Sequence, residues 1–486
     1  MLRSLYIIFF VAFLASCSSE VGYRQVPSLP PMFPDYSRAT IPYNIAPLNF
    51  RIDSADRISV TVKGRSEWTF ERRGELMRFP EKRWREMLAA ERGDTVEVYV
   101  RARFGKEDRG WRSLQWVIAD EPIDRYMSYR LIEPAYEVWN MLQIVERDLT
   151  GFDERILGDN NVVDRACINC HTSNRAEKPA TFMHVRGKGG GTIYSFDGEL
   201  RKVNTATDRT SAAVYGEIER SGRYGIFTTA EIIPMLHSMG NERMEVYDTE
   251  SDLILVDFAG CTVSDSPCVS GPEFQETFPC FSPDGETIYF CRAKALPQPD
   301  STFRMHYDLC AIDFDAEAGR LGDSVRVVFD ATAAGKSVSF PKCSPDGRFL
   351  LMTVSDYGTF PIWHRETDLW MLDLQSGRID SLPQVNGRYS DSYHSWGSNS
   401  RWVAFASKRD DRVYGRPYIA YVSPEGEVGE PFVLPQRDPR RYLTTLKSFN
   451  IPELYASPEV YDTHSLSDIY FDAPAEKFEY KENFSE

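Results

Sequence analysis

A repeated strand–turn–strand unit is the feature that most limits how this chain can fold. Two copies carry the turn Ser-Pro-Asp-Gly, at 282–285 and 344–347, and an apolar run follows each turn. Degenerate copies around Gly222 and Ser400 complete a series with steps of 63, 62 and 53 residues. Proline presets φ, and Asp-Gly accepts a tight reversal. Repeats of this length built on short strands predict a β-propeller over residues 181–455, with six blades, the first formed partly by 181–203.

The first 17 residues have the pattern of a targeting segment. Arg3 gives a positive start, and the apolar run 5–14 is too short to span a bilayer. The run ends in Leu-Ala-Ser-Cys at Cys17, which resembles the lipobox of bacterial lipoproteins, whose cysteine is lipidated. Ser18 in place of aspartate favours the outer membrane by the same resemblance. The alternative is an ordinary secretory signal with a chance cysteine, and either one takes the chain out of the cytoplasm.

Charge and length limit the function classes. The net charge of −16 argues against a nucleic-acid partner. No other apolar run is long enough to cross a membrane. The remaining chain is long enough for two or three domains with sizeable cores. We therefore expect a soluble body in the cell envelope, held at the membrane by its N-terminal lipid.

The chain before the repeats divides into three segments. Residues 18–45 are rich in proline and predict an extended tether. Residues 46–132 alternate with period two and contain one helical insertion at 81–92, which suggests a small fibronectin-like β-sandwich. In 133–180 we expect a helix near 133–142 followed by a haem-binding segment. Residues 456–486 form an acidic tail that straps onto the propeller or moves freely. The fold class is mainly β.

The strongest chemical motif is Cys167-Ile168-Asn169-Cys170-His171, the C-x-x-C-H pattern of c-type haem attachment. Two thiols at this spacing reach the two vinyl groups of one haem, and the adjacent histidine binds the iron. A thioredoxin-type C-x-x-C needs a strand-to-helix setting that is not evident. A zinc site needs a second ligand pair, and none is nearby. We expect one covalent haem c on Cys167 and Cys170, with His171 as the proximal iron ligand.

The sixth iron ligand has two nearby candidates. His184 would give bis-histidine ligation, and Met183 would give His/Met ligation with a higher potential. Their side chains point to opposite sides if this segment is a strand, so at most one of them reaches the iron. His237 is the best distant candidate, and an open site is the remaining alternative.

Basic residues near the motif are candidates for pairing with the haem propionates. Arg165, Arg186 and Lys188 flank the two segments that carry the predicted iron ligands. Each is equally consistent with an ordinary surface charge.

Six cysteines remain outside the motif and the N-terminus. An even number in an oxidising compartment permits disulfides, but buried free thiols explain them equally well. They are Cys261, Cys268, Cys280, Cys291, Cys310 and Cys343.

These features together resemble a known family. The Ser-Pro-Asp-Gly turn before an apolar strand is similar to the propeller of TolB-type proteins. The whole arrangement resembles Bacteroidetes lipoproteins that join a C-x-x-C-H segment to such a propeller. The segments that carry the resemblance are 129–134, the motif at 167–171 and 184–186. The resemblance implies the propeller fold and haem binding, and it names no reaction.

The resulting hypothesis is a lipid-anchored, monohaem c-type cytochrome that carries electrons, with the propeller as a docking domain for a redox or envelope protein. A second hypothesis is a TolB-like scaffold that binds a protein or glycan, with a structural haem. A third is a haem enzyme such as a peroxidase, which needs an open sixth site. No G-x-S-x-G elbow is present, so no hydrolase is indicated.

Overall fold

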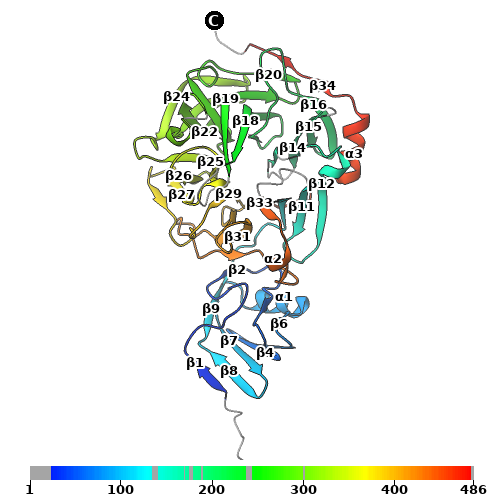
Figure 1. The fold of residues 1–486 in the computed structure, drawn as a ribbon, viewed down its shortest axis with the longest axis vertical. Coiled ribbons are helices and arrows are strands. Elements are labelled where there is room, and N and C mark those ends of the chain that lie inside the picture. The colour runs from blue at the N-terminus through cyan, green and yellow to red at the C-terminus, as the bar shows by residue number, and fades with distance from the viewer. Residues whose placement is uncertain are drawn as a thin grey trace, which may run out of the picture.

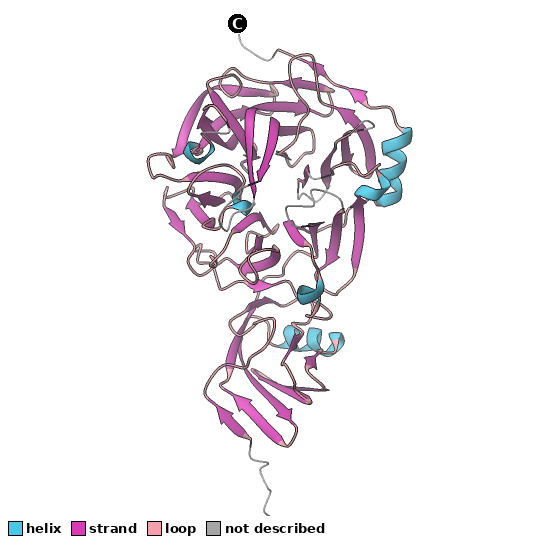
Figure 2. Cartoon of the chain, viewed as in Figure 1, coloured by secondary structure: helices cyan, strands magenta, loops and turns pink. Residues whose placement is uncertain are grey.

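The structure is a computed structural model that describes residues 23–133, 141–168, 170–174, 179–187, 190–236, 244–298 and 301–482, with the backbone alone for Cys170. A six-bladed β-propeller carries a smaller N-terminal domain on its rim (Figure 1). Strands dominate and helices are few (Figure 2), so the predictions of a mainly β fold and of six blades are confirmed. Within the described ranges, no helix combines the length and apolarity needed to cross a bilayer. The predicted targeting segment, with Cys17, lies outside these ranges.

Each blade contains four antiparallel strands, named here from the propeller axis outward. Blades 1 to 3 are β13 (Cys170–Ser173), β14 (Ala180–Val185), β15 (Gly191–Phe196) and β16 (Glu199–Asn204); β17 (Gly216–Ile218), β18 (Tyr224–Leu236), β19 (Met244–Asp257) and β20 (Thr262–Ser264); and β21 (Phe274–Phe281), β22 (Thr287–Lys294), β23 (Asp308–Asp315) and β24 (Arg320–Phe329). Blades 4 and 5 are β25 (Ser337–Cys343), β26 (Phe349–Ser355), β27 (Asp368–Asp373) and β28 (Ile379–Ser381); and β29 (Asp391–Trp396), β30 (Trp402–Ser407), β31 (Arg416–Tyr421) and β32 (Phe432–Val433).

The Ser-Pro-Asp-Gly turns join the first two strands of blades 3 and 4. In blade 4, the Ser344 hydroxyl donates to Asp346 over 2.6 Å and accepts from the Phe349 amide over 2.9 Å. Gly347 takes φ +73°, a left-handed conformation that favours glycine. Ser282 makes the same two contacts in blade 3. The repeated motif is therefore a side-chain-locked reversal that sets where each blade begins.

Blade 6 is built from both ends of the chain. Its inner strand is β33 (Ser448–Tyr455), followed outward by β10 (Tyr126–Ile132), β11 (Leu142–Asp148) and β12 (Glu154–Asp159). The segments that we expected to end a sandwich and to form a helix thus contribute strands to the propeller. Residues 134–140 of the expected helix lie outside the described ranges, and residue 142 already belongs to a strand. Pairing the first and last parts of the chain within one blade closes the ring of blades.

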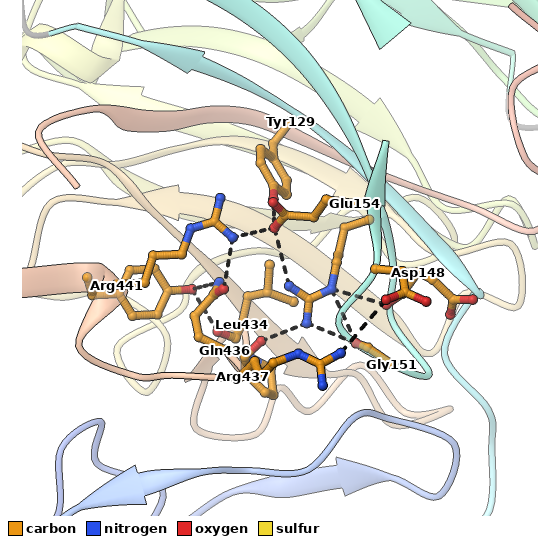
Figure 3. Close-up of polar contacts among 12 residues, drawn as sticks. Tyr129, Asp148, Gly151, Glu154, Leu434, Gln436, Arg437 and Arg441 are labelled. Carbon is orange, nitrogen blue, oxygen red and sulfur yellow. Dashed lines mark hydrogen bonds and ion pairs between the residues drawn. The ribbon is translucent and has the colours of Figure 1, made fainter. Parts of the chain in front are cut away.

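A buried polar network holds this closure together (Figure 3). The Arg147 side chain, 1% exposed, donates to the carbonyls of Gly151 (2.9 Å) and Pro435 (3.0 Å) and pairs with Glu154 (3.4 Å). Glu154 also accepts from the Tyr129 hydroxyl over 2.6 Å and from Arg441. The short helix α2 (Arg441–Thr444) thereby ties the C-terminal segment to strands from the first third of the chain.

The N-terminal domain is one seven-stranded sheet, with a helix providing much of its core. Its strands are β1 (Arg24–Val26), β2 (Thr40–Pro42), β4 (Arg57–Lys63), β5 (Glu67–Arg73), β7 (Thr95–Phe104), β8 (Glu107–Trp111) and β9 (Leu114–Ala119), beside the pair β3 (Phe50–Arg51) and β6 (Leu76–Met77). The predicted helix is present as α1 (Glu81–Ala90), which buries Trp84 against Trp116. The two-sheet sandwich is not confirmed. The described part of the expected tether contributes β1 and β2 to the sheet instead.

The C-terminal tail is a strap along the propeller edge. Helix α3 (Thr463–Asp472) contacts β12 and β16, and β34 (Glu476–Lys477) and β35 (Glu479–Tyr480) add parallel strands to blades 1 and 2. The red segment in Figure 1 follows this path. Of the two alternatives for the tail, the described residues show the strap. Within the described ranges, the six cysteines for which disulfides were considered form no disulfide.

Candidate functional site

A ring of side chains lines the propeller channel, with one contributed by each blade. We call it the channel ring, and its members are His171, Tyr215, Phe278, Phe340, Tyr393 and Ile451. In blades 3 to 6 the member has a left-handed backbone, with φ between +49° and +51°, at a bulge in the inner strand. Large side chains rarely adopt this conformation, and such strain is concentrated at functional sites. The histidine of the C-x-x-C-H motif thus occupies a position that the other blades fill with apolar or aromatic groups.

Four aromatic members of the ring form a continuous wall. Ring centroids are 5.3 Å apart for Tyr215 and Phe278, 3.9 Å for Phe278 and Phe340, and 5.1 Å for Phe340 and Tyr393. Phe360 packs on Tyr215 and Phe278 at 5.7 Å. Contacts of this kind stabilise the wall beyond the burial of its area, and the wall they form is apolar.

His171 is buried in β13, with its side chain 3% exposed. Neither ring nitrogen has a hydrogen-bond partner among the described residues. The nearest carboxylate is that of Glu453, 3.9 Å from Nε2. Burial, together with the charge of Arg130, lowers the pKa of His171 to about 3. The imidazole is therefore neutral at physiological pH, and protons do not compete for its lone pair.

A recess opens from the ring on one face of the propeller. It shares Tyr215, Phe340, Tyr393 and Ile451 with the channel. Strand ends and connections of blades 1, 2, 4, 5 and 6 supply the rest of its lining, which includes Cys167, Arg130, Ile132, Glu133, Arg186, Ile232, Pro234, Met244, Val246, Phe360, Ile362, Trp363, Lys408, Val413, Ser448 and Asn450.

The motif reaches the recess through a tight turn. Asp164 and Arg165 both take left-handed backbones, with φ +56° and +54°, and redirect the chain after β12 and the short helix at 160–162. The carbonyl of Cys167 then accepts a 2.9 Å hydrogen bond from the Arg186 amide. This bond fixes Cys167, 7% exposed, on the recess wall beside Arg186. Arg165 is exposed and is not among the lining residues.

The two nearby candidates for the sixth ligand lie on β14, which pairs with β13. His171 is directly opposite Met183, and Cys170 is opposite His184. Directly paired residues share a face of the sheet, so His171 and His184 project from opposite faces. Met183 is on the face of His171, but it is 1% exposed and packs in the apolar cluster of Leu466 and Ile168. In this register neither candidate lines the recess.

His184 has a local partner instead. Its Nδ1 lies 3.2 Å from the Thr192 hydroxyl on β15. Burial, and then the charge of Arg186, lowers the pKa of His184 to about 4. The other predicted residues, His237, Lys188 and the Cys170 side chain, lie outside the described part of the chain.

The β18–β19 hairpin is the most prominent feature that the sequence did not predict. Its strands of 13 and 14 residues exceed those of the other blades, and it brings Met244 to the recess. Next to it, the Glu245 carboxylate lies 3.0 Å from Nε2 of His364, which follows the short helix at 361–363. This buried ion pair ties blade 2 to a connection of blade 4 across the face.

Some of this site could have been found in the sequence. Phe278-Pro279 and Phe340-Pro341 both stand four residues before a Ser-Pro turn, so the repeat itself marks two ring positions. Met244 and Arg130 have no such signal, because long-range pairing alone brings them to the recess. No group of three or more metal-ligating side chains occurs in the described ranges.

Comparison with known proteins assigns the chain to no family, and the solved structures that match it are distant. No protein-family profile and no curated protein matches the chain. A periplasmic gluconolactonase from Pseudomonas aeruginosa is 14% identical, with a TM-score of 0.34, and the match covers 68% of this chain and 100% of the lactonase. A puromycin-hydrolyzing peptidase from Mycobacterium tuberculosis is 14% identical with a TM-score of 0.34, and the match covers 55% of this chain and 39% of the peptidase. A DUF4784 family protein from Bacteroides caccae is 10% identical with a TM-score of 0.28, over 71% of this chain and 94% of that protein.

Proposed function

We propose that this chain is a c-type haem protein of the cell envelope that transfers electrons, with the haem bound at the recess and the propeller as its scaffold. The observation that carries the proposal is His171, a buried neutral imidazole whose ring nitrogens have no hydrogen-bond partner in the described structure. Leaving both nitrogens buried in this way costs about 1–3 kcal/mol. A residue of the C-x-x-C-H motif that carries this cost at the channel ring fits an iron ligand better than a core residue.

His171 lines the channel, and the residues that line the adjoining recess fit the same group. Cys167 is on the wall of the recess, next along the chain from the segment that contains Cys170. The aromatic wall suits a flat macrocycle, and it excludes water from one side. The recess is also lined by the positively charged side chains of Arg130, Arg186 and Lys408. Such side chains pair with propionate carboxylates.

A bound haem supplies one-electron chemistry at its iron. The chain's own residues prepare the environment. His171 stays neutral because burial opposes its protonation. The apolar ring lowers the local dielectric, and the lining arginines place positive charge beside it. These are the means by which a protein sets a potential: ligand identity, burial and nearby charge.

The test is covalent haem content. The protein is made with bacterial haem c maturation machinery and then denatured, and the retained haem is measured by mass and by the visible spectrum. We expect one haem per chain and an α-band that sharpens on reduction. Cys167→Ser and Cys170→Ser should each weaken or abolish attachment, whereas Cys268→Ser, at a half-buried thiol between blades 2 and 3, should leave it intact. A chain without bound haem would sink the proposal.

The lining also favours one sixth ligand over another. Met244 lines the recess, whereas the face of β14 that carries His184 is turned away from that of His171. We expect carbon monoxide to bind the reduced Met244→Ala protein, but not the reduced His184→Ala protein. The reverse result would restore His184 as the ligand and indicate a different register for β13.

Lipid attachment at Cys17 belongs to the same proposal, and it rests on the sequence pattern alone.

A binding scaffold with a structural haem is the competing function. It would be favoured if the haem-free Cys167→Ser protein kept its stability and its binding to an envelope partner.

A further inference from the structure

Three arginines surround one tyrosine ring beside the recess. The guanidinium carbons of Arg365, Arg388 and Arg412 lie 5.0, 5.6 and 5.0 Å from the ring centroid of Tyr389. The ring is 9% exposed, whereas Arg388 and Arg412 are exposed and Arg365 is half-buried. Cation–π attraction orients each guanidinium but does not neutralise its charge.

The acidic residues close to them in the chain are engaged elsewhere. Asp391 pairs with Arg409 at 2.7 Å, Asp411 lies 3.6 Å from Arg416, and Glu366 lies 3.6 Å from His364. Among the residues that the structure describes, none of the three arginines of the cluster forms an ion pair. Three like charges held around one ring repel one another, so an incoming anion gains from all three.

The cluster is continuous with the recess. Arg365 lies on the β26–β27 connection, which lines the recess through Trp363. Arg412 lies on the β30–β31 connection, which lines it through Lys408 and Val413. The Lys408 ammonium lies 4.6 Å from the Trp363 ring and joins the two connections. A partner seated on the arginines would therefore sit at the edge of the recess mouth.

We propose that Arg365, Arg388 and Arg412 form a docking surface for a carboxylate-rich protein partner. Arginine forks bind carboxylates in a bidentate manner, and arginine and tyrosine are enriched at the energetic centres of protein interfaces. The chain as a whole carries −16, so the cluster is a local positive site on an acidic protein. Such a site fixes the orientation of an acidic partner more than it raises long-range attraction. A flat membrane surface would need a broader cationic plane than three arginines around one ring.

The docking surface is tested with labelled poly-L-glutamate as the acidic probe and the purified chain in low-salt buffer, by fluorescence anisotropy. We expect salt-sensitive binding that falls by about tenfold or more in Arg388→Glu/Arg412→Glu. Arg85→Glu, an exposed arginine on α1, should bind as the wild type does. Arg388→Gln/Arg412→Gln should give an intermediate affinity, and thermal unfolding verifies that each variant folds.

The haem-free Cys167→Ser protein should bind the probe with wild-type affinity, which separates this proposal from the proposed function. Equal weakening by Arg85→Glu, or no binding by the wild type, would overturn it. Displacement of the probe by free glutamate at the same carboxylate concentration would indicate a small-anion site instead. Tighter binding to phosphatidylglycerol vesicles through the same arginines would indicate a membrane contact, and it too would overturn the proposal.

Discussion

Two buried polar regions of the propeller differ in whether their polar groups have hydrogen-bond partners. In the closure of blade 6 (Figure 3), Arg147, Glu154 and Tyr129 share hydrogen bonds and ion pairs with the C-terminal segment. At the channel ring, His171 is equally buried, yet its nitrogens have no hydrogen-bond partner in the described structure. Buried polar groups that serve stability have hydrogen-bond partners. The difference marks the closure as structural and the ring as functional.

The largest expected effect on stability comes from removing Arg147 from the hydrogen-bonded closure of blade 6. Arg147→Met leaves the carbonyls of Gly151 and Pro435 without their donor and removes one partner of Glu154. We expect a loss of about 3–5 kcal/mol in the free energy of unfolding, because two carbonyls lose a buried charged donor and Glu154 keeps Arg441 as its cationic partner. Denaturant titration measures it.

Arg85→Met on the surface of α1 is the matched control, with an expected change within about 0.5 kcal/mol. Equal losses in the two variants would mean that the closure network is not a special source of stability.

A second prediction concerns the ion pair that holds the β18–β19 hairpin over the recess. Burial alone would lower the pKa of His364, but Glu245 and Glu366 outweigh it and raise the pKa to about 9. The folded pKa lies above the unfolded value, so the stabilisation is complete below about pH 6.5 and is lost as the pH rises to about 9. We expect the wild type to lose about 3 kcal/mol over this range relative to His364→Gln.

Denaturant titration at several pH values measures this difference. His464→Gln, an exposed histidine on α3, should follow the wild type. Parallel pH profiles for the wild type and His364→Gln would show that the pair adds nothing to stability.

The smallest expected effect is an increase in stability, and it tests directly whether His171 serves function or the core. His171→Phe places in blade 1 the side chain that blades 3 and 4 carry at the ring, and it removes two unsatisfied nitrogens. We expect the haem-free protein to become more stable by about 1–2 kcal/mol. Thermal unfolding of the Cys167→Ser background, with and without the change, measures it. Destabilisation would show that His171 serves the core.

Local patterns predicted part of this protein well. The Ser-Pro-Asp-Gly turns and the spacing of the repeats predicted the propeller, and the helical insertion predicted at 81–92 is present as α1 (Glu81–Ala90). The assignment of 126–159 failed, because β10 pairs with β33 more than 300 residues later, as in Tyr126 with Tyr455. Such a pairing leaves no periodic signal of its own. The haem on Cys167 and Cys170, and the lipid on Cys17, stay predictions.

The sequence by itself determined the repeat, the turn chemistry and the C-x-x-C-H spacing, because each depends on residues that are near one another in the chain. Only the tertiary structure decided where His171 lies and what surrounds it. Its place in the channel ring depends on six inner strands meeting at one axis, and the recess depends on strand ends and connections from five blades. Met244 and the three arginines around Tyr389 reach the same face by long-range packing, which no local pattern encodes.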